Sequence, residues 1–532
     1  MKRSDGQAMR LDDCQVCIPQ IFANHARTFT NKPAIVCGDQ VRTWREFDAN
    51  MSRIANSLLA IGIGRGHKVA VLMNSGIEIL EVMFGIVRAG ACVVPLSGLL
   101  TSDQLTTLLA DSNSVVIFCA RSQQTKVDEC RKALPHIDSR HFFATDFEAP
   151  GWRNYESLIA TASDAFPKVT YQQDDAFNII YSSGTTGLPK GIVQTHRARL
   201  HWAFSNAIDM HFHVNAKGLT STALYSNGTW LTMLPTLFVG ATLYVMPEFK
   251  PSLFLDMIQK YGITHTFTVP TQLILSLAEP VDAMRDLSSL QAVLCAGSTL
   301  RTEVRREVLQ RLTPNLYCMY GFSEGFATLC KPDQHAAKGD SVGLPVLGFE
   351  VMIVDDAGTE LAWGQTGEIA GYGAGLMQCY HNREDTTSES IVLDRRGRTY
   401  FRSGDIGRID EDGFLYVMDR KKDMIISGGF NIFPVDIETV VGAHADVLDV
   451  SVIAIADPKW GETPLALVIP RHAHANASAI REWANARLAK HQRISRVELV
   501  KELPRNALGK VLKRLLRDQY SADANAHKRT EA

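Results

Sequence analysis

The sequence is poor in the features that mark specialised classes of protein. Its ten cysteines are few for 532 residues and most stand in apolar surroundings, so they form no disulfide framework and indicate buried free thiols in a reducing compartment. It contains no apolar run long enough to span a bilayer, and its N-terminal residues lack the apolar core of a secretion signal. A net charge of -2 provides no electrostatic attraction for nucleic acid or an anionic membrane. We therefore expect a cytoplasmic protein with no transmembrane segment and no nucleic-acid partner.

Two short motifs have the spacing of a metal or redox site but lack the rest of one. Cys14 and Cys17 are separated by two residues, with no second cysteine pair or histidine cluster nearby. His211 and His213 are equally unsupported by other ligand-type residues. We interpret the cysteine motif as a chance pairing and the two histidines as structural or exposed.

Hydrophobic periodicity in the first half of the chain predicts an α/β fold. A strand-like run at 69–73 precedes an amphipathic segment at 77–88 and a second strand-like run at 91–94. The same rhythm recurs at 114–120, at 241–246 before 251–261, and at 290–295 before 301–312. Such β-α-β units build parallel sheets with helices on their faces. A chain of this length exceeds one compact core, so two or three domains are expected.

The second half of the chain has a different pattern of hydrophobic and turn-forming residues. From about Gly343 short strands alternate with Gly and Asp turns, which is typical of antiparallel β structure. Beyond a charge cluster, a strand-like run at 447–456, a helical segment at 477–489 and a basic tail indicate a small separate α+β domain. We place the boundary in the charge cluster, so that residues 1–419 form an N-terminal domain, 420–422 a hinge, and 423–532 a C-terminal domain.

The stretch YSSGTTGLPKG, at 181–191, has the composition of a phosphate-binding loop. Its glycines let the backbone approach a ligand closely, and its hydroxyls, backbone N–H groups and lysine can surround an anion. The loop is not the common G-x-x-x-x-G-K-[ST] motif, because Pro189 and Gly191 stand where that motif needs glycine and Ser or Thr. On its own the stretch is equally compatible with a flexible surface loop. The residues that carry the phosphate prediction are Ser182, Ser183, Gly184, Thr185, Thr186, Gly187 and Lys190.

Four further segments, read together with this loop, resemble a known superfamily. They are YGFSE at 320–324, RSGDIG with Asp405, DRKKDMIISGGFNI with Arg420, and LPRNALGK with Lys510. In order and spacing they are similar to the adenylate-forming superfamily of acyl-CoA synthetases, adenylation domains and beetle luciferases. The resemblance covers nearly the whole chain, from Thr43 to the terminal basic helix.

The resemblance implies a fold and a reaction. The fold has a large N-terminal domain of stacked α/β sheets plus a small β-barrel, and a small mobile α+β C-terminal domain that swings over it. In the reaction, ATP and a carboxylic acid give an acyl-adenylate and pyrophosphate, and a thiol, usually that of coenzyme A, then displaces AMP. ATP, Mg²⁺ and coenzyme A are the implied cofactors and partners, together with a small-molecule carboxylic acid.

The resemblance also assigns roles to individual residues of the nucleotide site. The 182–191 loop, with Thr185 and Lys190 as catalytic residues, would hold the β- and γ-phosphates, and Glu324 would hold Mg²⁺, a hard cation that takes oxygen ligands. Asp405 and Arg420 would reach the ribose, although Asp419 stands where the superfamily usually has glycine. Lys510 would bridge the acid and the α-phosphate during adenylation. The remaining nucleotide contacts are Gly297, Ser298, Tyr320, Gly321 and Ser323, with Tyr320 stacking on adenine.

The acyl site is the least specific part of the resemblance. The superfamily's gate segment usually reads Pro-Leu-Phe-His, whereas here it reads ALYSNG at 223–228, with neither proline nor histidine. The expected walls are mostly apolar or aromatic, which favours a hydrophobic monocarboxylic acid over an amino acid or a dicarboxylate. The predicted acyl-site residues are Tyr225, Thr229, Trp230, Val269, Ala296 and Phe322, and the predicted coenzyme A and hinge residues are Lys422, Gly428 and Gly429.

Several alternatives stay open at this point. The acyl group could pass to a separate carrier protein in place of coenzyme A, the adenylate could take a luciferase-like oxidative fate, or the chain could be a non-catalytic nucleotide-binding relative. The last alternative is disfavoured because Lys510, Glu324 and Asp405 are intact. The identity of the acid and the oligomeric state, with a homodimer among the alternatives, are not determined by the sequence.

Overall fold

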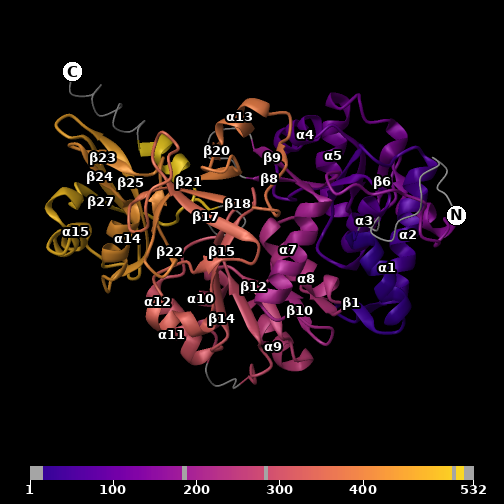
Figure 1. Cartoon of the computed structure of the whole chain (residues 1–532), viewed down its shortest axis with the longest axis horizontal. Helices are drawn as coiled ribbons and strands as arrows, with labels where there is room; N and C mark the ends of the chain where they lie inside the picture. The colour runs from indigo at the N-terminus through magenta and orange to yellow at the C-terminus, as the bar shows by residue number, and fades with distance from the viewer. Residues whose placement is uncertain (1–15, 183–188, 281–284, 506–510, 521–532) are drawn as a thin grey trace.

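The computed structural model describes residues 16–182, 189–280, 285–505 and 511–520. Within these residues the strands form four sheets, of nine, eight, five and five strands. Figure 1 shows the N-terminal helices and sheets at one end of the molecule and the C-terminal sheet, with its helices, at the other. Among the described residues, no helix combines the length and the apolar character needed to cross a membrane.

The eight-stranded sheet contains the predicted β-α-β unit. Helix α3 (Ile77–Arg88) connects two parallel neighbours, β3 and β4, and nearly all of its residues are buried, so it is covered on every side. Strands β8 and β9 at the other side of the sheet pair antiparallel. In order, the strands are β19 (Cys379–Tyr380), β9 (Lys190–Thr195), β8 (Ala176–Ser182), β4 (Cys92–Pro95), β3 (Lys68–Leu72), β5 (Ser114–Cys119), β6 (Phe142–Ala144) and β7 (Arg153–Asn154).

The nine-stranded sheet has a parallel centre and antiparallel edges. Helix α9 (Pro251–Tyr261) on this sheet matches its predicted bounds, because Pro251 fixes the first turn and Gly262 ends it in the left-handed conformation. In order, the strands are β16 (Leu344–Pro345), β15 (Ala327–Cys330), β14 (Leu316–Gly321), β13 (Ala292–Cys295), β12 (His265–Thr268), β10 (Lys217–Thr220), β11 (Thr242–Val245), β1 (Pro33–Cys37) and β2 (Gln40–Thr43).

One hydrophobic core joins the two large sheets. It contains residues of β1 and β11 from the nine-stranded sheet, residues of β3, β4, β5 and β8 from the eight-stranded sheet, and the apolar faces of helices between them. Helices α7 and α8 occupy the middle of the molecule in Figure 1. The remaining helices that accompany the two large sheets are α1 (Ile18–Thr28), α2 (Trp44–Ala60), α4 (Ser102–Asp111), α5 (Gln124–Cys130), α6 (Tyr155–Ala160), α7 (His196–Asp209), α8 (Trp230–Phe238), α10 (Pro270–Leu277), α11 (Thr302–Arg311) and α12 (His335–Lys338).

The antiparallel region predicted from about Gly343 forms the third sheet. Its strands are β17 (Phe349–Val354), β18 (Gly367–Gly373), β21 (Thr399–Ile409), β20 (Ile391–Leu393) and β22 (Leu415–Arg420), and the short helix α13 (Glu384–Glu389) precedes β20. Within the described residues the strand order stays open, with β17 at one edge and β20 at another. The region is therefore a half-barrel, where the sequence predicted a small barrel.

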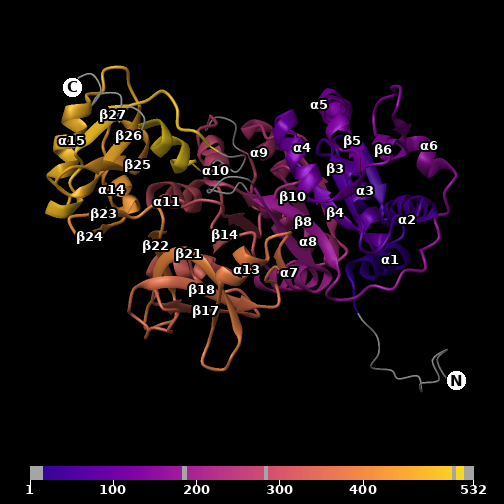
Figure 2. The same ribbon diagram turned by 90° about the horizontal axis from the view of Figure 1, so that it is seen from above.

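The fourth sheet lies beyond Arg420 and has its own core. Apolar residues of β23, β25 and β26 pack there against helices α14 (Pro434–Gly442) and α15 (Ala477–Asn485). Figure 2 shows this body beside α11 of the nine-stranded sheet. Its strands are β24 (Phe430–Ile432), β23 (Ile425–Ser427), β26 (Gly461–Pro470), β25 (Val447–Asp457) and β27 (Arg496–Leu499). The α/β fold class, with a large N-terminal part and a small α+β C-terminal part, is thus as predicted.

The nine cysteines among the described residues are all free. Burial raises the pKa of thiols such as Cys92, to about 12, so they are inert under ordinary conditions. Cys17 is buried, and Cys14 lies outside the described residues. Across the part of the chain that the structure describes, no group of three or more His, Cys, Asp or Glu side chains could hold a metal ion.

Candidate active site

The predicted phosphate loop connects two paired strands. The pairing of β8 with β9 continues as far as Ser182 opposite Lys190, so the two ends of the predicted loop are held side by side. Ser183, Gly184, Thr185, Thr186 and Gly187 lie outside the described residues. Their contact with phosphate, and that of Ser182, therefore stays a prediction.

A third residue, Tyr380, contacts both Lys190 and Glu324. The short strand β19 pairs with β9, which sets Tyr380 opposite Ile192. The Lys190 ammonium lies 4.7 Å from the centre of the Tyr380 ring, and the Tyr380 hydroxyl donates a 2.7 Å hydrogen bond to Glu324 Oε1. Burial, followed by the Glu324 charge, holds the pKa of Tyr380 far above its usual value, so the hydroxyl keeps its proton. The sequence analysis did not identify Tyr380.

The turn that carries Glu324 is fixed by backbone contacts. Met377 N–H donates to the Glu324 carbonyl (2.7 Å), and the Gln194 side chain donates to the Ser323 carbonyl (2.9 Å). Gly325 has a φ of 113°, and a Cβ there would lie 2.3 Å from the Gly375 carbonyl oxygen, so no other residue fits.

The surroundings of Glu324 suit Mg²⁺ better than a metal that needs several protein ligands. Tyr380 occupies Oε1, which leaves Oε2 as a hard oxygen ligand. Mg²⁺ is commonly held by one or two carboxylates together with waters and substrate phosphates. A single carboxylate that shares Tyr380 with Lys190 therefore fits that ion, and no larger ligand cluster occurs in the described residues.

Asp405 contacts both Tyr320 and Arg420, and all three residues are predicted to contact the nucleoside. The Tyr320 hydroxyl donates to Asp405 Oδ2 at 2.7 Å, and Arg420 Nε lies 3.7 Å from Asp405 Oδ1. Asp405 and Arg420 are directly paired across β21 and β22. Burial, and then the Asp405 charge, raises the pKa of Tyr320 well above its usual value. Strand pairing thus places a two-oxygen acceptor beside a guanidinium, and the hydrogen bond from Tyr320 adds an aromatic ring from the nine-stranded sheet.

The segment predicted to contact adenine follows β13. Ala296 N–H donates to the Thr268 carbonyl (3.2 Å), which ties the segment to the end of β12. Gly297 has a φ of 95°, and both Gly297 and Ser298 are exposed. Gly321 ends β14, where a Cβ would lie 2.7 Å from the Phe326 carbonyl oxygen. Both glycines are required by the local backbone, which leaves their contact with nucleotide as a prediction.

Asp419, the departure from the superfamily pattern, has a structural role. Its Oδ1 accepts the Arg420 N–H (2.7 Å), and its Oδ2 accepts the Val435 N–H (3.1 Å) in the first turn of α14. Burial raises the pKa of this carboxyl. Asp419 therefore links the end of β22 to the C-terminal body across the predicted hinge.

The gate segment is held by its own hydrogen bonds. Thr229 Oγ1 donates to the Ala223 carbonyl at 2.7 Å, and Trp230 Nε1 donates to the Leu224 carbonyl at 3.0 Å. Trp230 is only 2% exposed and belongs to the core between the two large sheets. This packing role accounts for Trp230, and its predicted contact with the acyl group stays untested. Tyr225, Ala296 and Phe322 are half-buried, whereas Thr229 and Val269 are buried.

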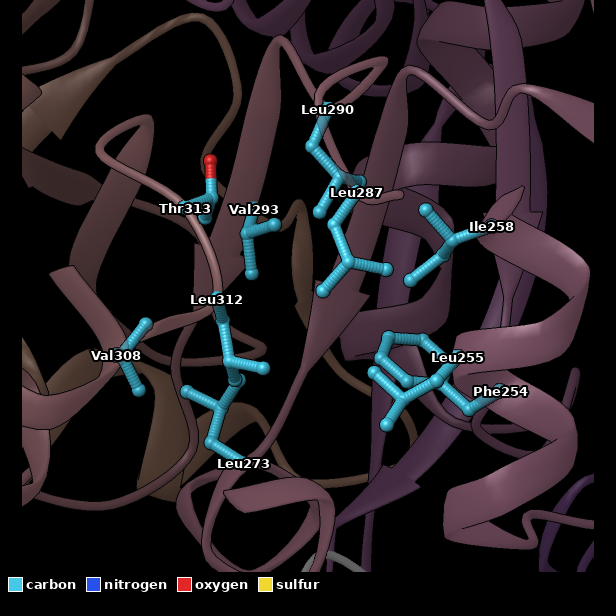
Figure 3. Close-up of a pocket in the computed structure, with 10 residues that line it drawn as sticks. All are labelled: Phe254, Leu255, Ile258, Leu273, Leu287, Leu290, Val293, Val308, Leu312 and Thr313. Atoms are coloured by element: carbon cyan, nitrogen blue, oxygen red, sulfur yellow. The ribbon is translucent and has the colours of Figure 1, made fainter. Parts of the chain in front are cut away.

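Figure 3 shows a cavity that does not match the predicted acyl site. It has a volume of about 10 Å³, close to the space of one water molecule, and its lining is apolar apart from Thr313. It lies between α9, α10 and α11, and none of the six predicted acyl-site residues lines it. We regard it as a packing defect of this layer.

The predicted hinge and coenzyme A residues lie at the start of the C-terminal body. Lys421 forms ion pairs with Asp356 (2.7 Å) and Glu368 (3.3 Å), and burial followed by the Arg420 charge lowers the pKa of Lys422 to about 8. Gly428 and Gly429 have φ values of 56° and 84°. A Cβ at Gly428 would lie 2.7 Å from the Trp460 ring, while one at Gly429 would meet no described atom within 4 Å.

Asp449 connects the C-terminal body to the nine-stranded sheet. Arg301, just before α11, pairs with Asp449 Oδ1 at 2.6 Å, and Arg505 pairs with its other oxygen. Lys510, the predicted adenylation lysine, lies outside the described residues. On its C-terminal side, Val511 forms an isolated β-bridge with Arg505, and Lys513 pairs with Glu438 at 2.8 Å.

Comparison with known proteins identifies the family. The AMP-binding enzyme model matches residues 22–381, and the AMP-binding enzyme C-terminal domain model matches residues 436–510. The chain belongs to the AMP-binding enzyme family and is of its AMP-forming acid–CoA ligase type.

Two curated relatives and one solved structure illustrate the similarity. The chain is 34% identical to an indoleacetate–CoA ligase of Aromatoleum aromaticum, over 92% of this chain and 95% of that one. It is 30% identical to a long-chain-fatty-acid–CoA ligase of Mycobacterium tuberculosis, over 90% and 93% of the two chains. The structure of ATP-bound MatB from Rhodopseudomonas palustris superposes with a TM-score of 0.86 at 25% identity, covering 95% of this chain and 99% of that one.

Proposed function

We propose that this protein uses ATP to activate a hydrophobic carboxylic acid, fatty, aromatic or alicyclic, as an acyl-adenylate and then transfers the acyl group to coenzyme A. The observation that carries the proposal is the meeting of Lys190, Tyr380 and Glu324. A cation and a carboxylate beside a hydroxyl- and glycine-rich loop are suited to an ATP triphosphate with its metal ion. The Tyr320, Asp405 and Arg420 cluster, on strands next to this site, is suited to the nucleoside end of the same ligand.

In the first half-reaction the carboxylate attacks the α-phosphorus and pyrophosphate leaves. Two anions must approach each other, so the positive charges that neutralise the developing charge lower the barrier. Lys190 supplies one such charge at the phosphate loop, and Lys510, with the loop residues Thr185 and Thr186, is assigned to the same task. Mg²⁺ bound at Glu324 would screen the phosphate oxygens. Ser323, Ser298 and Gly297 would line the purine side.

In the second half-reaction the coenzyme A thiol attacks the acyl carbonyl and AMP leaves. We assign this step to a second arrangement of the C-terminal body, reached by rotation at Lys422. Gly428 and Gly429 would then border the pantetheine arm. In the described arrangement the space around Gly429 is open, which is compatible with a close approach of another chain or ligand there. Hinges of this kind need only a few residues that absorb the change in φ and ψ.

The acid is proposed to be hydrophobic because the gate and its surroundings are mostly apolar or aromatic. The relatives named above act on indoleacetate and on long-chain fatty acids, and both are acids with one carboxylate and a large apolar part. Tyr225, Phe322 and Ala296 are the half-buried residues that we assign to the acyl contact, with Val269 and Thr229 behind them. An aryl or alkyl tail would be held by burial of its apolar surface.

The decisive test measures the two half-reactions separately. Acid-dependent pyrophosphate release from ATP should occur with fatty, aromatic or alicyclic acids, and thioester should form when coenzyme A is added. Lys510→Ala should lower adenylation by roughly a hundredfold or more while thioester formation from synthetic acyl-AMP survives, because the lysine acts only in the first step. Lys501→Ala, an exposed lysine near the same end of the chain, is the control.

The alternatives predict different results in the same assays. Thioester on a purified carrier protein but not on coenzyme A would indicate a carrier-loading enzyme. Nucleotide binding without pyrophosphate release for any acid would indicate a non-catalytic relative. Equal loss of both half-reactions in Lys510→Ala would contradict the role assigned to that lysine.

A further inference from the structure

Arg199, on α7, is a buried cation whose partners are all uncharged. It is 2% exposed, and its guanidinium donates from Nε to Asn178 Oδ1 at 2.6 Å and from Nη2 to Asn227 Oδ1 at 2.8 Å. The guanidinium carbon also lies 4.5 Å from the centre of the Trp230 ring. Among the described residues no carboxylate forms an ion pair with it. The sequence analysis gave Arg199 no role.

This arrangement is energetically costly. Burial lowers the pKa of Arg199 to about 9, so the group is still protonated near neutral pH and its charge lies in an apolar environment. A buried charge without an opposite charge is tolerated only when its donors are well satisfied. Here two amide oxygens accept from Nε and Nη2, and the Trp230 ring adds a cation–π contact. An apolar side chain would fill this space without the free-energy cost of burying a charge. We therefore look for a functional reason for the hydrogen bonds that Arg199 makes.

Both amide partners belong to segments that the proposed reaction uses. Asn178 lies in β8, the strand that ends at Ser182 and leads into the predicted phosphate loop. Asn227 lies in the gate segment, within the short 3-10 turn Asn227–Thr229 that precedes α8. One side chain therefore bridges the strand that supports the ATP loop and the turn that borders the proposed acyl site.

The other side of the same turn is also fixed. A Cβ at Gly228 would lie 2.6 Å from Cζ of Phe267 in β12, so the turn rests against that ring with no room to shift toward it. Thr229 is anchored to the Ala223 carbonyl. The turn is thus enclosed between Phe267 and the Arg199–Asn227 hydrogen bond, and loss of that bond would free it on one side only.

We propose that Arg199 is a positioning residue for acid binding, which holds the gate segment through Asn227 and couples it to β8 through Asn178. The inference rests on the proposed function, since it assumes that the gate borders the acid. It assigns the acid-binding geometry to a residue that does not itself contact the acid. The acid Michaelis constant should therefore depend on Arg199 more strongly than the ATP Michaelis constant does.

The test compares kinetic constants for pyrophosphate release in matched variants. Arg199→Met and Asn227→Leu should each raise the acid Michaelis constant by about tenfold, the usual effect of losing one hydrogen bond to a charged group, and should alter the ranking of acids. The ATP Michaelis constant should change by less than about twofold. Asn227→Asp keeps an acceptor for Arg199 and should stay close to the unmodified protein. Arg197→Met is the control, because Arg197 lies on the same helix but is exposed and pairs with Asp174.

Coupling through Arg199 is tested by a double-mutant cycle. Asn178→Leu and Asn227→Leu should have non-additive effects on the acid Michaelis constant, because both substitutions release the same guanidinium. If Arg199→Met folds poorly, the test relies on Asn227→Leu, because Asn227 is only half-buried and its substitution disturbs the core less. Variants that lose only thermal stability, with acid constants and acid ranking unchanged, would overturn the inference. Absence of acid-dependent pyrophosphate release in the unmodified protein would instead overturn the proposed function.

Discussion

Tyr380 donates a 2.7 Å hydrogen bond to Glu324, a residue 56 positions away in the sequence. The bond leaves one carboxylate oxygen available and holds it in a fixed direction, while the face of the same phenol ring lies beneath the Lys190 ammonium. Tyr380 therefore orients the anion and the cation that we assign to the ATP phosphates. Its hydroxyl stays protonated because burial and the Glu324 charge raise its pKa.

Removing this hydroxyl should weaken the use of Mg²⁺ and ATP. We expect Tyr380→Phe to lower kcat/KM for MgATP by about tenfold, because a hydrogen bond to a charged group is lost while the ring under Lys190 is kept. Glu324→Gln should lower it by about a hundredfold or more, because the charge itself is lost. The measurement is initial-rate kinetics of pyrophosphate release at varied Mg²⁺. Tyr372→Phe, in the half-barrel, is the control, and an equal effect in that variant would contradict the role of Tyr380.

A second prediction concerns the acyl group. Tyr225→Ala should change the relative kcat/KM of a large and a small acid by about tenfold, because one wall of the proposed site recedes. The ATP Michaelis constant should stay within about twofold of its original value. Competition assays with paired acids measure the first quantity. Tyr261→Ala, a half-buried tyrosine on α9, serves as the control, and an unchanged acid ranking in Tyr225→Ala would place the site elsewhere.

The ion pair between Arg301 and Asp449 should restrain the C-terminal body in the described arrangement. The two side chains are 40% and 22% exposed, so solvent screens the pair and the expected effect is small, about 0.2–1 kcal/mol. Arg301→Ala should accelerate tryptic cleavage at the predicted hinge about two- to fivefold, measured by mass spectrometry of the hinge fragments. Arg306→Ala, at an exposed arginine on the adjoining helix α11, should leave the rate unchanged. Equal rates in all three proteins would mean that the pair does not hold the body.

The fourth prediction is a pH dependence at Glu81. This glutamate is 2% exposed, and burial raises its pKa to about 7 although Asn50 and Arg42 bond to it. The folded state therefore binds the proton more tightly than the unfolded chain. Between the ordinary pKa of about 4.5 and the folded value of about 7, the free energy of unfolding falls as the pH rises.

Glu81→Gln removes the charge that becomes costly above pH 7. We expect the variant to match the unmodified protein near pH 5 and to be more stable at pH 8, by about 1–3 kcal/mol. Urea denaturation at both pH values measures the difference. Exposed Glu156→Gln is the control. A stability difference that is the same at both pH values would show that Glu81 does not titrate as described.

Local sequence patterns determined the bounds of several elements. The helix at 77–88 and the helix at 251–261 occur with the predicted bounds, because apolar periodicity marks the first and Pro251 with Gly262 marks the second. The helix predicted at 477–489 ends earlier, at Asn485, since nothing in that stretch fixes its C-terminus as strongly. The prediction of antiparallel strands after Gly343 is confirmed. The open strand order was not predicted, because it depends on pairing between distant segments.

The sequence alone also determined the family, because the order and spacing of its short motifs resemble those of the superfamily. It assigned residues to the nucleotide site as well, and their contacts with nucleotide stay predictions. Only the tertiary structure decided which side chains meet. Tyr380 reaches Glu324 because β19 pairs with β9, and Arg199 reaches the gate because α7 packs beside β8. Trp230 lies in the core. The sequence did not reveal this, because an aromatic residue that packs against protein and one that packs against a ligand have the same local pattern. Contacts of this kind are set by strand pairing and helix packing across tens of residues, and no local pattern encodes them.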